Sequence, residues 1–269
     1  LRELTGRPDN DDWPLQAAVE AAAGQMTTSR LDHILRDALT QPAFHPSVGH
    51  LWLKHVGPHR CWFTKVRFVE RLIGLGSSRA SSWTVADLMV SLGDHGHWAW
   101  LRYFMARHHQ WLHDDTWAWA YTGRALLMVR RYWAVVRWYE GYSERKDLHP
   151  WMVHILMQSL RQLGRVDAAC EASRFALSLS PDHATDSHRV MLAYGEAARG
   201  RFEEARELID PVLPKVKDLD EQARGILSMV RAMLAVALDR DKERYRRARG
   251  HLNEVKCNCL RWHCFFRRG

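Results

Sequence analysis

Helix starts recur along this chain at a nearly constant interval, and this interval constrains its fold more than any other feature. The predicted first helices of successive helical hairpins begin near Ser47, Ser82, Asp115, Pro150, Asp186 and Glu221. These starts are 35, 33, 35, 36 and 35 residues apart. Apolar residues recur at helical spacing almost throughout, whereas strand-like alternation between tight turns is absent from the sequence. The sequence therefore predicts an all-α protein of repeated hairpins that stack around one continuous core.

Two adjacent units carry the repeat most clearly, residues 149–184 and 187–213. In each unit the first helix ends at a glycine, Gly164 or Gly200, where a positive φ costs little and the chain can reverse. A small residue, Ala169 or Ala205, follows five positions later in the second helix. A small side chain there lets the two helices of the hairpin approach closely.

These units resemble tetratricopeptide repeats, helix-turn-helix hairpins of about 34 residues, and the resemblance is clearest over residues 150–213. Upstream the period persists and Ala134 stands in the expected place of the small residue, but the pattern weakens because Val129 stands where glycine is usual. The resemblance implies an α-solenoid of about seven hairpins wound into a right-handed superhelix. It divides the chain into an irregular N-terminal helical pair (1–46), the repeats (47–219) and a lengthened C-terminal capping hairpin with a basic tail (220–269).

One stretch, residues 51–73, resembles a related family, the half-a-tetratricopeptide repeats of RNA-processing scaffolds. Its first helix is aromatic and its second helix carries a Glu-Arg pair. The hairpin geometry of the two families is nearly the same, so the predicted fold does not change. The alternative function that this resemblance implies is an RNA- or polyanion-binding adaptor.

Tryptophan is concentrated in one part of the chain, since eleven of the 13 Trp residues fall between Trp52 and Trp151. One interpretation is that they fill the joints between hairpins, each burying about 150–250 Å². The other is that some line the concave groove of the solenoid, where they anchor a peptide or stack on a sugar or a base.

In the register of tetratricopeptide repeats, the first helix of each hairpin faces the groove. The resemblance therefore places eight residues there: Trp83, Trp119, Gly123, Trp151, His154, Gln158, Arg161 and Tyr194. Its four aromatic members form a ladder, and the polar ones set specificity. Family members that grip a terminal carboxylate use Lys, Arg and Asn at these positions, a set that this chain lacks apart from Arg161. We expect a non-enzymatic scaffold or adaptor that binds a peptide segment or a protein partner in this groove.

The positive charge of the chain lies at one end. Residues 241–269 carry nine Lys or Arg against three acidic residues, which is +6 of the total formal charge of +8. Arg244, Arg247 and Lys256 lie near aromatic residues such as Trp262, a combination typical of nucleic-acid contacts. They are the predicted contacts of the alternative, polyanion-binding function; otherwise this segment is a solvated capping helix.

Motifs of enzymes are absent from the sequence, including glycine-rich phosphate loops, nucleophile elbows and dinucleotide fingerprints. His109 and His113 could share one helical face, and Cys257 and Cys259 offer soft ligands. Neither spacing is a strong metal signature, so we expect no cofactor and no bound metal. A third hypothesis is a helical accessory subunit of an enzyme complex.

The five cysteines are scattered, which is a poor framework for disulfides and favours a reducing compartment. The most apolar stretch, residues 226–238, is interrupted by Arg231 and is shorter than the roughly 20 residues that a membrane span needs. We therefore expect a cytoplasmic protein without a membrane span. The sequence leaves the oligomeric state open.

Overall fold

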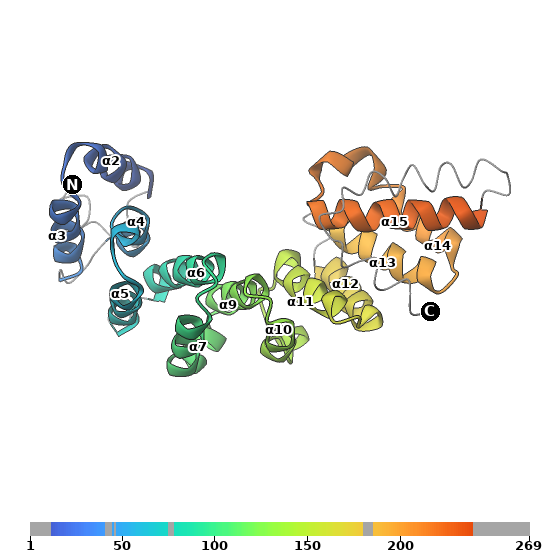
Figure 1. Cartoon of the computed structure of the whole chain (residues 1–269), viewed down its shortest axis with the longest axis horizontal. Helices are drawn as coiled ribbons and strands as arrows, with labels where there is room; N and C mark the ends of the chain where they lie inside the picture. Colours follow the sequence, from blue (N-terminus) through green and yellow to red (C-terminus); the bar gives the residue numbers. More distant parts are fainter. Residues whose placement is uncertain (1–11, 41–44, 46, 75–77, 180–184, 239–269) are drawn as a thin grey trace. The chain divides into compact units, whose positions relative to one another are not determined.

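The structure is a computed structural model that describes residues 12–40, 45, 47–74, 78–179 and 185–238. Every regular element among these residues is helical (Figure 1), which confirms the predicted all-α class. The chain forms two compact units, unit 1 (Leu1–Trp138) and unit 2 (Tyr139–Gly269). Among the described helices, none is long and apolar enough to cross a membrane.

Unit 1 begins with two helices that precede its first regular hairpin. In each hairpin the second helix packs against the first helix. Its helices are α2 (Asp12–Gln25), α3 (Thr28–Ala38), α4 (Val48–His55), η1 (Gly57–His59), α5 (Trp62–Gly74), α6 (Ser78–Asp94), α7 (Trp98–Arg107), α8 (His109–Asp114), α9 (Thr116–Met128) and α10 (Tyr132–Trp138). Consecutive helices pack as the pairs α4 with α5, α6 with α7, and α9 with α10. The first helices also stack on one another, α4 on α6 and α6 on α9.

Unit 2 repeats this organisation. Its helices are η2 (Tyr142–Glu144), α11 (Pro150–Gln162), α12 (Val166–Leu179), α13 (Asp186–Ala198), α14 (Phe202–Ile209), η3 (Leu213–Asp218) and α15 (Glu221–Leu238). The pairs are α11 with α12 and α13 with α14, while α13 also packs against α12 and α15.

The predicted helix starts are confirmed for five of the six first helices, namely α4, α9, α11, α13 and α15. The prediction for the remaining one is wrong, because α6 begins at Ser78 rather than near Ser82. Ser82 lies inside the helix, where its hydroxyl donates a hydrogen bond to the carboxylate of Asp115. It therefore links two repeats instead of capping one.

The turn after each first helix is the same in four consecutive hairpins. Two residues beyond the helix end, the backbone takes a positive φ at Gly96 (69°), Arg130 (59°), Gly164 (74°) and Gly200 (80°). At each turn the next N–H donates to the carbonyl five residues earlier, at 2.8 to 2.9 Å, from His97 to Leu92, Arg131 to Leu126, Arg165 to Leu160 and Arg201 to Glu196. These bonds are the Schellman motif that closes a helix C-terminus. The turns are 34, 34 and 36 residues apart, so both units share one repeat.

The start of the second helix follows the same register. The residue five positions after each turn is fully buried, and these residues are Leu101, Val135, Ala169 and Ala205. The predicted packed positions of Ala169 and Ala205 in the second helices are therefore confirmed. Ala134 and Val129 are each one residue out of register, because Arg130 takes the turn position that glycine takes elsewhere. Val135 then occupies the packed position in place of Ala134.

A serine-aspartate hydrogen bond also recurs in both units. Asp115 precedes α9 and accepts from the N–H of Ala118 at 2.7 Å, while Ser82 donates to its other oxygen. Asp220 precedes α15, accepts from the N–H of Ala223 at 2.8 Å and from the Ser187 hydroxyl at 3.3 Å. Each serine precedes its aspartate by 33 residues. The carboxylate that caps one first helix thus fastens it to the first helix before it.

Candidate functional site

Exposed tryptophans lie on the first helices of unit 1. Trp83 on α6 is 51% exposed and Trp117 on α9 is 40% exposed. Their ring centroids are 5.2 Å apart with an interplanar angle of 32°. Tyr121, one turn further along α9, continues the line, with its ring 6.3 Å from that of Trp117. We call Trp83, Trp117 and Tyr121 the aromatic row.

The aromatic row follows the repeat seen in the turns. Trp83 and Trp117 both precede the positive-φ residue of their hairpin by 13 positions, and Trp151 precedes Gly164 by the same interval. Trp151 is the second residue of α11 and half-buried in unit 2, as Trp117 is the second residue of α9 in unit 1. The repeated tryptophan position is therefore Trp83, Trp117 and Trp151.

Trp119 does not belong to this set, because its side chain lies in the core of unit 1 with only 1% exposure. Its indole N–H donates to the carbonyl of Trp138 at 3.1 Å, and the indole of Trp138 donates to the carbonyl of Trp119 at 2.9 Å. This reciprocal pair joins α9 to α10. Trp119 thus fills a joint between helices, and the groove assignment made for it is wrong.

Gly123 is buried on α9 as well, on the side of the helix that faces away from the aromatic row. α9 and α6 approach each other closely nearby, since a side-chain carbon at Gly93 would lie 2.9 Å from the Cα of Ala125. Glycine at residue 93 is therefore required for the packing that brings Trp83 beside Trp117.

In unit 2 the structure brings together the three polar residues predicted on α11. The amide nitrogen of Gln158 lies 2.6 Å from Nε2 of His154, and Arg161 donates to the side-chain oxygen of Gln222 on α15 at 2.9 Å. All four side chains line one small, tight pocket, together with Ser187 and apolar residues. We call His154, Gln158, Arg161 and Gln222 the polar pocket.

A buried histidine and an aspartate support this pocket. His188 on α13 is fully buried, with Nε2 at 3.0 Å from the carbonyl of Pro150 and Nδ1 at 3.4 Å from the Ser173 hydroxyl. Its ring lies edge-on to His154, with centroids 5.5 Å apart. Burial, with the neighbouring His154 charge, lowers the pKa of His188 to about 4. His188 is therefore neutral at physiological pH.

His154 lies 3.6 Å from the carboxylate of Asp220. Burial lowers the pKa of His154, while the charge of Asp220 acts in the opposite direction. The sequence does not predict Gln222 in this pocket, nor Asp220 and His188 beside His154. The signal that could have found Asp220 is its position one residue before the predicted start of α15, where aspartate caps helices.

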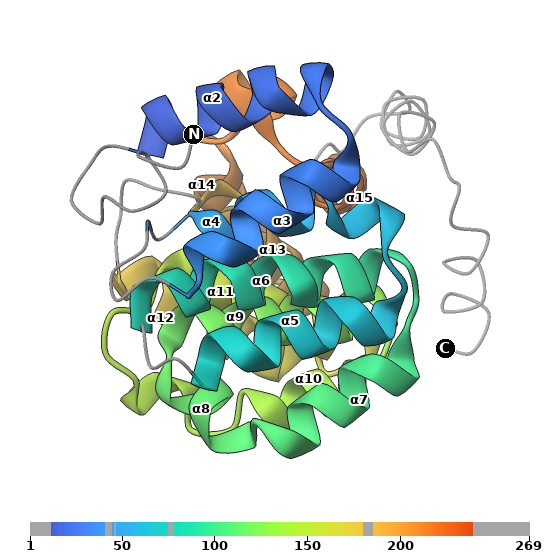
Figure 2. The same ribbon diagram turned by 90° about the vertical axis from the view of Figure 1, so that its left-hand side faces the viewer.

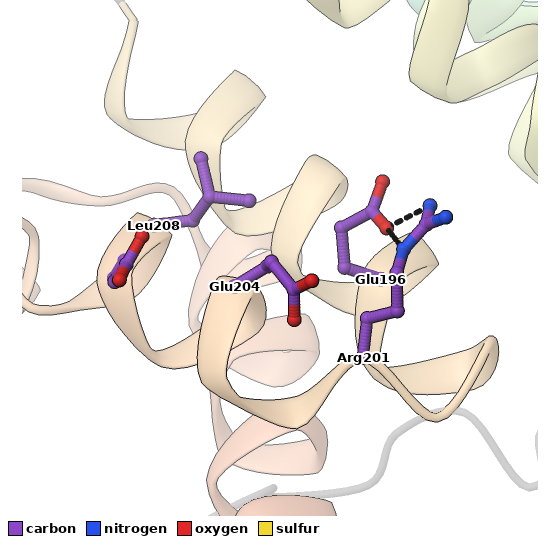
Figure 3. A pocket seen from close by; sticks show the side chains of 5 residues that line it. Glu196, Arg201, Glu204 and Leu208 are labelled. Carbon is purple, nitrogen blue, oxygen red and sulfur yellow. Dashed lines mark hydrogen bonds and ion pairs between the residues drawn. The ribbon is translucent and has the colours of Figure 1, made fainter.

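Tyr194 is half-buried on α13 and does not line the polar pocket. A second pocket, shown in Figure 3, lies at the turn between α13 and α14 and has a volume of about 520 Å³. Arg201 points at Glu196 there, and Glu196 also pairs with Arg174 at 3.0 Å and Arg199 at 3.2 Å. Glu196 is only 7% exposed, so this cluster fixes the turn.

The remaining site expectations fall in three places. Arg244, Arg247 and Lys256 lie outside the described residues, as do Cys257 and Cys259. His109 and His113 stack on each other at 4.6 Å, and both contact the ring of Trp138. Within the part of the chain that the structure describes, no three His, Cys, Asp or Glu side chains are placed to hold a metal ion.

The sequence matches no protein-family model, and no curated protein matches it. The likeness to tetratricopeptide repeats therefore rests on the spacing and turns described above and stays a prediction.

Proposed function

We propose that this chain is a non-enzymatic interaction scaffold whose hairpins form a right-handed, tetratricopeptide-like solenoid. The support for this architecture is the recurrence of one turn in four hairpins at intervals of 34 to 36 residues. The stacking of α4 on α6 and α6 on α9 in unit 1, and of α13 on α15 in unit 2, agrees with it.

The aromatic row is the observation that carries the function. A partner that covers Trp83 and Trp117 gains apolar burial at two adjacent large rings, which is the usual composition of a binding hot spot. Both rings lie on first helices. In the repeats that this chain resembles, the first helices line the face that binds ligands. The row therefore anchors a peptide segment or a protein partner through its apolar side chains.

The polar pocket supplies directional contacts on the corresponding helices of unit 2. Arg161 and the amides of Gln158 and Gln222 carry hydrogen-bond donors there, and the space between these side chains is too small for a water molecule, so a partner meets them at the rim of the pocket. We assign specificity to these side chains and affinity to the aromatic residues. The alternative polyanion-binding function of Arg244, Arg247 and Lys256 rests on sequence alone.

A displayed library of random peptides tests the proposal with the purified 269-residue chain. Peptides selected on the wild-type chain should bind the double variant Trp83→Ala/Trp117→Ala much more weakly, because each anchor contributes about 2 kcal/mol, or roughly 30-fold in Kd. The matched control is Trp133→Ala on α10, whose side chain is 61% exposed but lies outside the row. Equal peptide binding by all three proteins would refute the role of the row.

A further inference from the structure

A second exposed aromatic surface lies on α5 and α7, the second helices of their hairpins, which run side by side in unit 1 (Figure 2). Phe63 is 56% exposed and Tyr103 is 40% exposed. The ring of Trp100 lies between them, 6.4 Å from Phe63 and 5.9 Å from Tyr103. Two exposed rings, with the half-buried ring of Trp100 between them, thus form a continuous line across two helices.

Two arginines flank this line. The guanidinium of Arg67 lies 5.5 Å from the ring of Phe63, and its side chain is 55% exposed. Arg107, one turn beyond Tyr103 on α7, is 57% exposed. We call Phe63, Arg67, Trp100, Tyr103 and Arg107 the aromatic-arginine strip.

A single carboxylate holds the aromatic-arginine strip in place. Glu70 on α5 is 3.1 Å from Arg67 and 3.1 Å from Arg107, and it accepts a hydrogen bond from the hydroxyl of Tyr103 at 3.2 Å. Its side chain is only 9% exposed. The carboxylate therefore orients both arginines and one ring from beneath, while the outer faces of these groups remain exposed.

The charge of the two helices favours an anionic ligand. α5 and α7 contain five lysines and arginines against one acidic residue, Glu70, which is a net charge of +4. Lys65 belongs to this set, and its ammonium lies 3.9 Å from the ring of Trp62. Cations interleaved with exposed rings match a ligand that carries negative charges and flat faces together.

We propose that the aromatic-arginine strip binds single-stranded nucleic acid. Bases stack on Phe63, Trp100 and Tyr103, and phosphates pair with Arg67 and Arg107. A duplex does not fit this chemistry, because its bases are already stacked and cannot cover the exposed rings. An acidic peptide pairs with the arginines but leaves the rings uncovered. This surface is separate from the aromatic row and from the C-terminal basic tail.

Fluorescence anisotropy with a labelled 20-nucleotide oligouridylate and the full chain tests the proposal. Phe63→Ala/Tyr103→Ala should weaken binding about 30-fold, corresponding to about 1 kcal/mol for each lost stacking contact. Tyr103→Phe keeps the ring and should bind like the wild type. Arg67→Gln/Arg107→Gln should reduce the slope of log K against log salt by about 1.4, since each phosphate contact on a single strand contributes about 0.7.

The control for exposed aromatics is Trp133→Ala, which should leave the affinity unchanged. Thermal unfolding followed by circular dichroism should show that every variant remains folded, because the substituted side chains are exposed. Three results would overturn the proposal: no binding at low salt, binding lost only in Arg244→Ala/Arg247→Ala/Lys256→Ala, or equal affinity for a duplex, polyglutamate or anionic phospholipid vesicles. The second result would transfer binding to the C-terminal tail.

Discussion

The buried His188 should make unit 2 sensitive to acid, and His188→Gln should remove much of that sensitivity. The pKa of His188 is about 4 in the folded protein and about 6.5 in an unfolded chain. Because the folded pKa is lower, the unfolded state binds more protons below pH 6.5, so the free energy of unfolding decreases as the pH falls from 6.5 to 4. The full difference corresponds to about 3 kcal/mol, at 1.36 kcal/mol for each pKa unit.

Between pH 7 and pH 5 the expected loss is about 2 kcal/mol. Glutamine places a side-chain N–H near the position of Nε2, so it can still donate to the carbonyl of Pro150 while carrying no titratable group. His154 and the Ser173 hydroxyl are the other polar groups that face the ring, and both are unchanged in this variant.

Native-state hydrogen exchange of the amides of α13 measures this free energy for unit 2 alone, once protection factors are corrected for the pH dependence of intrinsic exchange. The wild-type opening free energy should fall about 2 kcal/mol further than that of His188→Gln between pH 7 and pH 5. His59→Gln, which replaces an exposed histidine of unit 1, should follow the wild type. Parallel pH profiles for the wild type and His188→Gln would show that His188 is not buried in its neutral form.

Three further comparisons of variants test the packing by chemical unfolding. Trp119→Ala should lower the free energy of unfolding by about 3–5 kcal/mol, because it leaves a large cavity and an unpaired Trp138 carbonyl. Trp117→Ala, which removes an exposed ring, should lower it by less than about 1 kcal/mol. Equal losses would refute the assignment of Trp119 to the core and Trp117 to the surface. Gly195→Ala places a carbon against the sulfur of Cys170, so it should lower the free energy of unfolding by about 1–3 kcal/mol. Adding Cys170→Ala should restore most of this loss, since the nearest remaining contact is then the Arg199 guanidinium at 3.6 Å. Arg130→Gly should raise stability by about 0.5–1 kcal/mol, because glycine takes a positive φ without strain; a decrease would argue against the turn at Arg130.

The sequence predicts the helices well because their limits depend on local chemistry. Backbone geometry alone sets several helix ends. In the structure α11 begins at Pro150 and ends just before Gly164, and α13 ends just before Gly200. The same logic fails at Arg130, where a charged residue adopts the positive φ that glycine usually takes. Without a glycine to mark the turn, the sequence predicts the register of that hairpin one residue too early, at Val129 instead of Arg130.

The polar pocket depends on contacts that local chemistry cannot reveal. Arg161 reaches Gln222 across 61 residues of sequence, and His188 meets the carbonyl of Pro150 across 38. The pattern of α11 indicates which of its residues share a face, but it does not tell which helix packs beside that face. His188 shows the limit most clearly, since a histidine in the first turn of an amphipathic helix would ordinarily be placed in solvent.

An error of register matters more for a helix surface than for the fold. Two residues along an α-helix correspond to a rotation of about 200°, so Trp117 and Trp119 point to nearly opposite sides of α9. The exposures of 40% and 1% follow from that rotation. The helix limits and pairings are the same for either assignment, yet the residue offered to a partner changes from one tryptophan to the other. The interval of 34 residues between Trp83 and Trp117, equal to that between Gly96 and Arg130, is the sequence signal that selects the exposed one.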